Sequence, residues 1–306
     1  MHEETVVFFS EWSGGEVRQI DPPEERDTLI WAAGTGGIVP SYVDFATWYA
    51  AEWLRRGFGI YYDNAFPKRA YDPVTTSAYD MEEYGFRQPS ARIWAHRDYM
   101  KRVWVLHRQL FNPRTPQMMM IHMTNTHIVP YMVFNDANLD LELLSGPQSA
   151  QSKFGHAFLR AESLGRQSGN IPLVLAISEP RTRWAAMLIH EIKLGIASAQ
   201  YPEVFDSFGY GLDDCVAYNY WDRDNPVHAT DDCAKTLLLK RNGELMLLVV
   251  NWAPEKTKVD LMIDLEALDV RPDQAIDAET SAVLPWKNAT LHLDLDVYGV
   301  CVVHFR

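Results

Sequence analysis

The sequence contains few cysteines and no long hydrophobic run. Only three residues are cysteine, Cys215, Cys233 and Cys301, which are too few and too scattered for a zinc site or a disulfide-stabilised scaffold. Cys215 and Cys233 could pair, but buried free thiols fit this spacing better. No window reaches the roughly 18 apolar residues that a membrane span requires, and the first residues lack the basic region and apolar stretch of a signal peptide. We therefore expect a soluble chain with no membrane partner.

Positively charged residues are in the minority as well. The chain carries 28 lysines and arginines against 41 aspartates and glutamates, a formal net charge of −13. Proteins that bind a phosphate backbone usually present a basic face, so the composition argues against nucleic acid and favours an uncharged or weakly charged partner. The signal for nucleotide binding is also weak, because the glycine-rich residues 34–37 lie well away from the first predicted strand.

Aromatic residues, by contrast, are plentiful. They make up 12% of the chain, with ten tryptophans and fourteen tyrosines. Sugar rings stack on flat aromatic faces, although large aromatic side chains also fill hydrophobic cores. With 306 residues, of which 47% are hydrophobic, the chain is long enough for one large domain and one small one.

Most of the chain alternates short apolar runs with helical segments. The first clear helix, residues 41–56, has Ser41 as its expected N-cap and Gly57 as its stop signal. Polar residues gather directly after several apolar runs, a pattern typical of a parallel α/β sheet or barrel. The predicted strands cover residues 5–9, 58–62, 118–123, 139–144, 172–177 and 216–221, and the other predicted helices cover residues 89–110, 128–134, 152–164 and 184–199.

From about Cys233 the pattern changes to short alternating strands. An Asn-Gly pair, Asn242 and Gly243, separates two alternating apolar runs, which is a strong hairpin signal. We therefore predict an α/β domain over residues 1–228 and a small antiparallel β-sandwich over residues 229–306. The predicted strands of the sandwich cover residues 235–240, 244–251, 258–264, 290–296 and 300–305.

This order of domains, with a strand ending in Tyr-Tyr-Asp-Asn at Asn64, resembles that of glycoside hydrolases. The resemblance is to the α-galactosidase-like clan and to relatives of glycoside hydrolase family 123. The segment Leu248–Trp252, followed by Val259–Leu261 and a chain end at Val302–Phe305, is similar to the sandwich that closes many such enzymes. The resemblance spans most of the chain, is architectural, and implies a (β/α)8-type TIM barrel followed by the sandwich.

When the predicted strands are numbered as in that clan, the barrel lacks its first two strands. If Asp63 ends the fourth strand, where the clan carries its nucleophile, residues 5–9 form the third strand and residues 216–221 the eighth. No residues then remain for the first two strands. Either the chain is the C-terminal part of a longer protein, which we favour, or something else covers an open edge. A missing N-terminal domain, or a second copy of the chain, is therefore the expected partner. The localisation stays open, because a missing N-terminal part would carry any export signal.

Asp63 is the first candidate catalytic residue. It follows five largely apolar residues, which predicts that its carboxylate stands at the barrel rim, where the loops after the strands build active sites. Asn64 is placed to bind a sugar hydroxyl or to orient Asp63, and Tyr62 adjoins both. A turn or a helix cap is the structural alternative, since Asp and Asn favour both.

Glu142 is the second candidate. Glycoside hydrolysis commonly uses two carboxyl groups that flank the bond. Glu142 lies within an apolar stretch, where burial raises the pKa of a carboxyl group and suits it to act as a general acid. Strand alternation puts Asp140 on the same face, so Asp140 competes for this role. A surface helix with ordinary exposed acids explains the same residues.

Other polar residues near the strand ends are candidate substrate-binding groups. A lone histidine on an apolar strand, such as His122, is more often a hydrogen-bonded core residue. His190-Glu191 lacks the second histidine of a zinc-protease motif, because Leu194 stands there, so we expect no metal. A Gly-x-Ser-x-Gly nucleophile motif is also lacking, which weakens an esterase hypothesis. The candidate group comprises Glu11, Trp12, His122, Asn125, His127, Glu179 and Arg181.

The leading hypothesis is a glycoside hydrolase that needs no cofactor. Asp63 would act as nucleophile or transition-state stabiliser and Glu142 as general acid/base. One alternative is a non-catalytic carbohydrate-binding or scaffolding barrel, and another is an enzyme for a different polar small molecule, because a fold does not determine a function. A separation of about 5 to 10 Å between the two carboxyl groups would favour hydrolysis.

Overall fold

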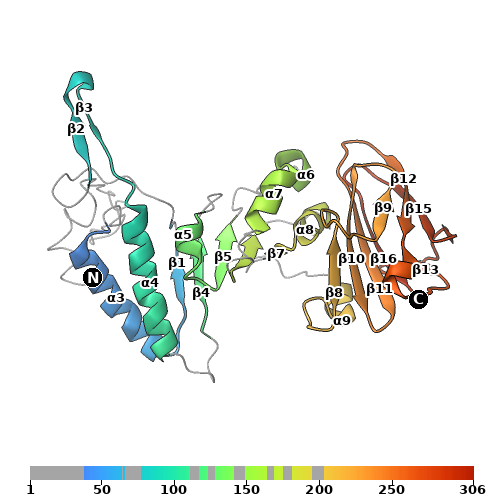
Figure 1. The fold of residues 1–306 in the computed structure, drawn as a ribbon, viewed down its shortest axis with the longest axis horizontal. Coiled ribbons are helices and arrows are strands. Elements are labelled where there is room, and N and C mark those ends of the chain that lie inside the picture. The colour runs from blue at the N-terminus through green and yellow to red at the C-terminus, as the bar shows by residue number, and fades with distance from the viewer. Residues whose placement is uncertain are drawn as a thin grey trace, which may run out of the picture. The chain divides into compact units, whose positions relative to one another are not determined.

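The computed structural model in Figure 1 describes two compact units, which are treated separately here. Unit 1 comprises the described residues within Met1–Leu139 and Gly165–Asn170, and unit 2 those within Asp140–Leu164 and Ile171–Arg306. Among all of them, no helix combines the length and the apolarity that a membrane span requires. The described residues are 38–63, 65, 77–110, 117–122, 128–140, 149–163, 169–174, 181–194 and 203–306.

Unit 1 contains parallel strands that confirm two of the predicted ones. β4 (Met119–His122) pairs in parallel with β1 (Ile60–Tyr62) on one side and with β5 (Ala137–Asp140) on the other. Gly59 makes the close approach of β1 and β4 possible, because a Cβ at this position would collide with the backbone of Met118. The predicted strand over residues 139–144 overlaps only the end of β5, and residues 5–9 lie outside the described residues.

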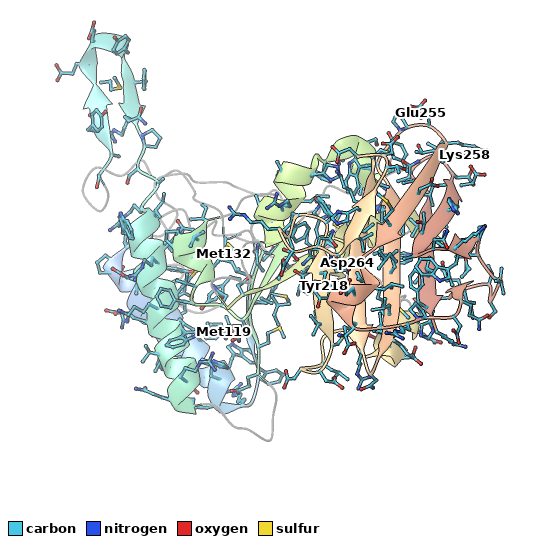
Figure 2. All side chains as sticks on the ribbon, turned by 45° about the vertical axis from the view of Figure 1, so that its right-hand side comes forward. Met119, Met132, Tyr218, Glu255, Lys258 and Asp264 are labelled. Atoms are coloured by element: carbon cyan, nitrogen blue, oxygen red, sulfur yellow. The ribbon has the colours of Figure 1, made fainter. Side chains whose placement is uncertain are left out.

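Two long helices pack on this sheet and on each other. They are α3 (Pro40–Arg55) and α4 (Ile93–Leu110). The short α5 (Val129–Met132) contributes to the same hydrophobic core. α3 begins at Pro40 with Val39 as its N-cap, two residues before the expected cap Ser41, because proline is well suited to the first helical position. The core between helices and sheet includes Met119 and Met132, both fully or almost fully buried (Figure 2).

A β-hairpin that the sequence analysis did not predict lies between β1 and α4. It consists of β2 (Tyr79–Met81), a single 3₁₀ turn (Glu82–Tyr84) and β3 (Phe86–Gln88). Gly85 closes the turn at φ 68°, in the left-handed region that glycine enters without strain.

Unit 2 begins with short helices and two parallel strands, β6 (Ile171–Val174) and β7 (Lys193–Leu194). The helix predicted over residues 184–199 is wrong in extent, because α8 (Arg181–Leu188) ends before Glu191, whose φ of 58° breaks the helix, and β7 follows. The helix predicted over residues 152–164 is two helices separated at Gly155. The remaining helices of this part are α6 (Ala150–Lys153), α7 (His156–Ser163) and α9 (Glu203–Phe208).

The C-terminal part of unit 2 is a sandwich of two antiparallel sheets, with strand orders β13-β16-β11-β10-β8 and β14-β15-β12-β9. The hairpin predicted at Asn242 and Gly243 is confirmed, with φ values of 52° and 80° at the two turn residues. The elements are β8 (Val216–Asn219), β9 (Val227–Ala229), β10 (Ala234–Arg241), β11 (Glu244–Asn251), β12 (Thr257–Ile263), α10 (Leu265–Leu268), β13 (Ala275–Asp277), β14 (Trp286–Lys287), β15 (Thr290–Leu295) and β16 (Val300–Phe305).

The strand expected to be the eighth of a barrel belongs to this sandwich instead. β8 pairs antiparallel with β10, with Tyr218 opposite Leu238. Tyr218 packs against the core between the two sheets, while Ala217 packs against a second core formed with α8 and α9. Residues on both faces of the strand thus contact a hydrophobic core, which explains the apolar run that suggested a barrel strand. The described residues form a mixed α/β fold, and closure into a barrel stays a prediction.

Candidate functional site

Asp63 and His122 meet where β1 and β4 end in unit 1. Because the two strands are parallel and pair at Tyr62 and Ile121, their carboxyl ends lie at the same edge of the sheet. The Oδ1 atom of Asp63 lies 3.0 Å from Nδ1 of His122 and 3.3 Å from the hydroxyl of Tyr61. The Tyr61 hydroxyl in turn lies 2.9 Å from the same His122 nitrogen. Three polar side chains thus converge at the carboxyl end of this strand pair.

Asp63 and His122 differ in solvent exposure, as expected for an accessible carboxylate that a buried side chain holds in place. The side chain of Asp63 is 57% exposed, whereas that of His122 is only 5% exposed. A proton on Nδ1 lets the imidazole donate to the carboxylate, and the Tyr61 hydroxyl donates to the same oxygen. The Tyr61 and His122 rings are also stacked, with centroids 6.2 Å apart. The Asp63 carboxylate is therefore accessible to solvent, while its hydrogen bonds to His122 and Tyr61 fix its orientation.

A cavity of about 420 Å³ adjoins Asp63. Its walls come from α3, β1 and α4, all within unit 1. The aromatic residues of α3 that line it recur at helical spacing, so that they share one face of the helix. Aromatic walls with one carboxylate at the margin suit a ligand that has apolar ring faces and polar edges, as a sugar has. The aromatic lining residues are Tyr42, Phe45, Tyr49, Trp53, Tyr61, Tyr62 and Tyr99.

Two tyrosines of the cavity are held in their neutral form. Burial raises the pKa of Tyr62 well above its usual value, and burial is also the main cause of the raised pKa of Tyr99. Their rings meet edge to face with centroids 5.8 Å apart. The Tyr62 hydroxyl is itself buried, beside the core of unit 1, and the role of Tyr62 in substrate binding stays a prediction.

Of the other predicted site residues, the structure describes two, and both belong to unit 2. Asp140 is 1% exposed and is the last residue of β5; the other three residues of that strand belong to unit 1. Arg181 opens α8, forms an ion pair with Glu279 and donates to the carbonyl oxygen of Val300 at 2.9 Å, where it lines a separate cavity of about 570 Å³. Glu11, Trp12, Asn64, Asn125, His127, Glu142 and Glu179 lie outside the described residues.

A second polar constellation, which the sequence analysis missed, lies in unit 2. Nδ1 of His190 is 2.7 Å from the Ala186 carbonyl oxygen, so this nitrogen carries the proton and donates. Nε2 of His190 then accepts from the Tyr220 hydroxyl at 2.9 Å. That hydroxyl lies 3.4 Å from Nδ1 of His156, whose ring packs on Trp252 with centroids 4.2 Å apart. The chain of hydrogen bonds links α7 and the end of α8 to the sandwich.

These histidines are neutral at pH 7. The pKa of His190 is lowered to about 4, mainly by burial; the Ala186 carbonyl opposes this change, and the nearby His156 and Arg160 contribute to it. Burial also lowers the pKa of His156 to about 4, with help from the positive charge of Lys235. Within the described residues, no group of three or more His, Cys, Asp or Glu side chains is arranged to hold a metal ion.

Residues 199–290 match the family model of the glycoside hydrolase 123 C-terminal domain. The matched segment holds α9 and all but the last two strands of the sandwich. The resemblance to family 123 that the sequence suggested is confirmed for this region, which is less than half of the chain. No curated protein sequence matches the chain.

Among solved structures, the chain resembles several glycosidases at low sequence identity. A family 27 β-L-arabinopyranosidase from Geobacillus stearothermophilus is 11% identical with a TM-score of 0.49, over 94% of this chain and 67% of that one. An α-galactosidase from Mortierella vinacea is 12% identical with a TM-score of 0.46, over 90% and 72% of the two chains. A maltogenic α-amylase from Thermotoga neapolitana is 13% identical with a TM-score of 0.39, over 68% and 58%. At these scores the resemblances establish neither the fold nor the substrate of this chain.

Proposed function

We propose that this chain is a glycoside hydrolase, or the C-terminal part of one, with its chemistry at the strand end marked by Asp63. The observation that carries the proposal is the exposed Asp63 carboxylate, oriented by His122 and Tyr61 beside an aromatic-lined cavity. The match of residues 199–290 to a glycoside hydrolase C-terminal domain supports the same class of reaction.

Asp63 acts in this proposal as the nucleophile or as the carboxylate that stabilises the positive charge of the transition state. A nucleophile has to be ionised and reachable, and the 57% exposure of its side chain satisfies the second condition. The buried His122 fixes the carboxylate direction, which lowers the cost of reaching the reactive geometry. Glu142 remains the proposed general acid/base, with Asp140 as the competing residue.

The test is the Asp63→Asn variant, assayed against a panel of aryl glycosides and oligosaccharides. The amide keeps the shape of the side chain but removes the negative charge, so turnover should fall by at least about a hundredfold, the lower end of what one catalytic group contributes. The matched control is Asp44→Asn on α3. Asp44 is an exposed carboxylate of the same unit; it is paired with Arg102 at 2.7 Å and does not line the cavity beside Asp63.

The control should keep wild-type turnover, and both variants should unfold at the wild-type denaturant concentration. Full activity in Asp63→Asn would contradict the assignment of Asp63. Glycan binding without turnover in the wild-type protein would favour the non-catalytic carbohydrate-binding alternative.

A further inference from the structure

The β2–β3 hairpin of unit 1 presents one aromatic face and one charged face. In the register of its two strands, Tyr79 pairs with Gln88 and Met81 with Phe86, so these four side chains share a face. Asp80 and Arg87 pair on the other face, where two hydrogen bonds of 2.7 and 3.0 Å join them. This bidentate ion pair links the two strands on the charged face of the hairpin.

The aromatic side chains of the hairpin are exposed rather than packed. Tyr79 is 57% exposed, Tyr84 63% and Phe86 51%, and the rings of Tyr84 and Phe86 lie 6.2 Å apart. Figures 1 and 2 both show the hairpin standing clear of α3 and α4, the long helices of its own unit. Three large rings held in water within so short a segment indicate a surface that binds something.

The charge of the hairpin restricts what that partner is. Residues 79–88 contain Asp80, Glu82 and Glu83 against the single basic residue Arg87, and the whole chain has a net charge of −13. Phosphate backbones and anionic lipid surfaces are therefore repelled, and so is a second copy of the same chain. A neutral partner meets no such cost.

The size of the face argues against a protein partner. Each ring, about half exposed, offers about 100 Å², which gives roughly 300 Å² in all. A stable protein–protein interface buries about 800 Å² on each partner. The face instead suits the apolar faces of a few sugar rings, and Gln88, which pairs with Tyr79 on this face, suits their hydroxyl groups.

We propose that the aromatic face of the β2–β3 hairpin is a binding surface for a neutral polysaccharide chain. The hairpin belongs to the connection that leaves the end of β1 directly after Asp63, so it is part of the same strand-to-helix segment as the proposed catalytic carboxylate. This inference rests on the proposed function in that a carbohydrate is the partner, and it adds a surface that holds polymeric rather than small substrates.

The experiment is native affinity electrophoresis in gels that contain soluble starch, arabinogalactan or xylan. The test variant is Tyr79→Ala/Tyr84→Ala/Phe86→Ala, and the conservative variant Tyr79→Phe/Tyr84→Phe keeps all the rings. Trp94→Ala is the matched control, because Trp94 is 69% exposed in the same unit but lies on α4. The same proteins are assayed on small aryl glycosides and examined by sedimentation velocity.

We expect at least one polysaccharide to retard the wild-type protein, and the triple alanine variant to bind it at least about tenfold more weakly. The conservative and control variants should bind as the wild type does, and hydrolysis of aryl glycosides should be unchanged in all of them. Binding by the phenylalanine variant would show that binding depends on the aromatic rings and not on the tyrosine hydroxyl groups.

Equal retardation of the wild-type and triple alanine proteins would overturn the inference, and so would the absence of retardation in all three gels. It would also be overturned if the alanine changes lowered the sedimenting mass and left retardation unaltered, since the hairpin would then join two copies. The proposed function fails separately, if no glycoside is hydrolysed or if Asp63→Asn keeps full turnover. Hairpin-dependent retardation would still stand in that case.

Discussion

Acidification from pH 7 to pH 4 is expected to destabilise unit 2 through His190. Burial lowers the pKa of this histidine in the folded protein from its ordinary value of 6.5 to about 4. As the pH falls below 6.5, the unfolded chain takes up a proton that the folded chain does not bind until about pH 4. The contribution of His190 to stability is therefore complete above pH 6.5, declines between pH 6.5 and 4, and is lost below pH 4.

The size of this effect follows from the two pKa values. A change from 6.5 to about 4 corresponds to about 3 kcal/mol of unfolding free energy. His156 changes in the same direction, but it is only partly buried, so solvent screening reduces its contribution. The charged groups around the pair are Arg160 and Lys235, which disfavour protonation, and Asp232, which favours it.

The assay is denaturant unfolding, followed by tryptophan fluorescence at several pH values between 7 and 4. Trp221 and Trp252 lie beside His190, with ring centroids 5.8 and 5.5 Å from its ring, so they report on this region. The His190→Gln variant should be less stable at pH 7, because the bond to Tyr220 is lost, but should lose less stability on acidification. His228→Gln, at an exposed position on β9 of the same unit, is the control.

The difference between wild type and His190→Gln isolates this residue from other groups that titrate over the same range. A wild-type stability that does not change between pH 6.5 and 4 would refute the reasoning. So would a His190→Gln variant that loses as much stability on acidification as the wild type does.

Three further predictions concern the proposed site and the sandwich. His122→Gln should lower turnover by about tenfold or more, because it disturbs the orientation of Asp63. It should also cost about 1 kcal/mol of unfolding free energy, because hydrogen bonds of a buried side chain are lost. Steady-state kinetics and a denaturant titration test this, and unchanged turnover would contradict it. Leu247→Ala should cost about 2–5 kcal/mol of unfolding free energy, because Leu247 is fully buried between the sheets, whereas Leu212→Ala at a 53% exposed position should change it by less than about 0.5 kcal/mol. Gly243→Ala should cost about 1 kcal/mol or more, because φ is 80° at this turn residue, and an unaltered thermal midpoint would show that the turn relaxes.

Turn residues, apolar periodicity and apolar runs in the sequence correctly predicted several helices, strands and one hairpin. The Asn242-Gly243 pair defined the β10–β11 hairpin, because only residues that tolerate positive φ fit such a turn. Apolar periodicity located α3 and α4 to within a few residues, and the apolar runs located β1 and β4. These features depend on neighbours along the chain, so the amino-acid order contains them.

The same signals did not predict which strands pair with one another. Residues 216–219 were predicted as a strand and form one, but the apolar run does not say whether the next strand is parallel or antiparallel. The exposed β2–β3 hairpin was missed for a related reason, since its aromatic residues lie on short strands stabilised by a cross-strand ion pair. The end of α8 was missed because the positive φ of Glu191 has no clear signature in a residue type that rarely adopts it.

For the candidate site, the sequence by itself determined that a carboxylate follows an apolar strand at Asp63 and that a histidine, His122, lies on a later apolar strand. The parallel pairing of β1 and β4 decided that the two side chains meet at 3.0 Å, although 59 positions separate them. The same is true of His156, His190 and Tyr220, which come from three separate segments. Residue order determines local conformation through short-range sterics, whereas contacts across the chain depend on which surfaces are buried together, and only the tertiary structure decides that.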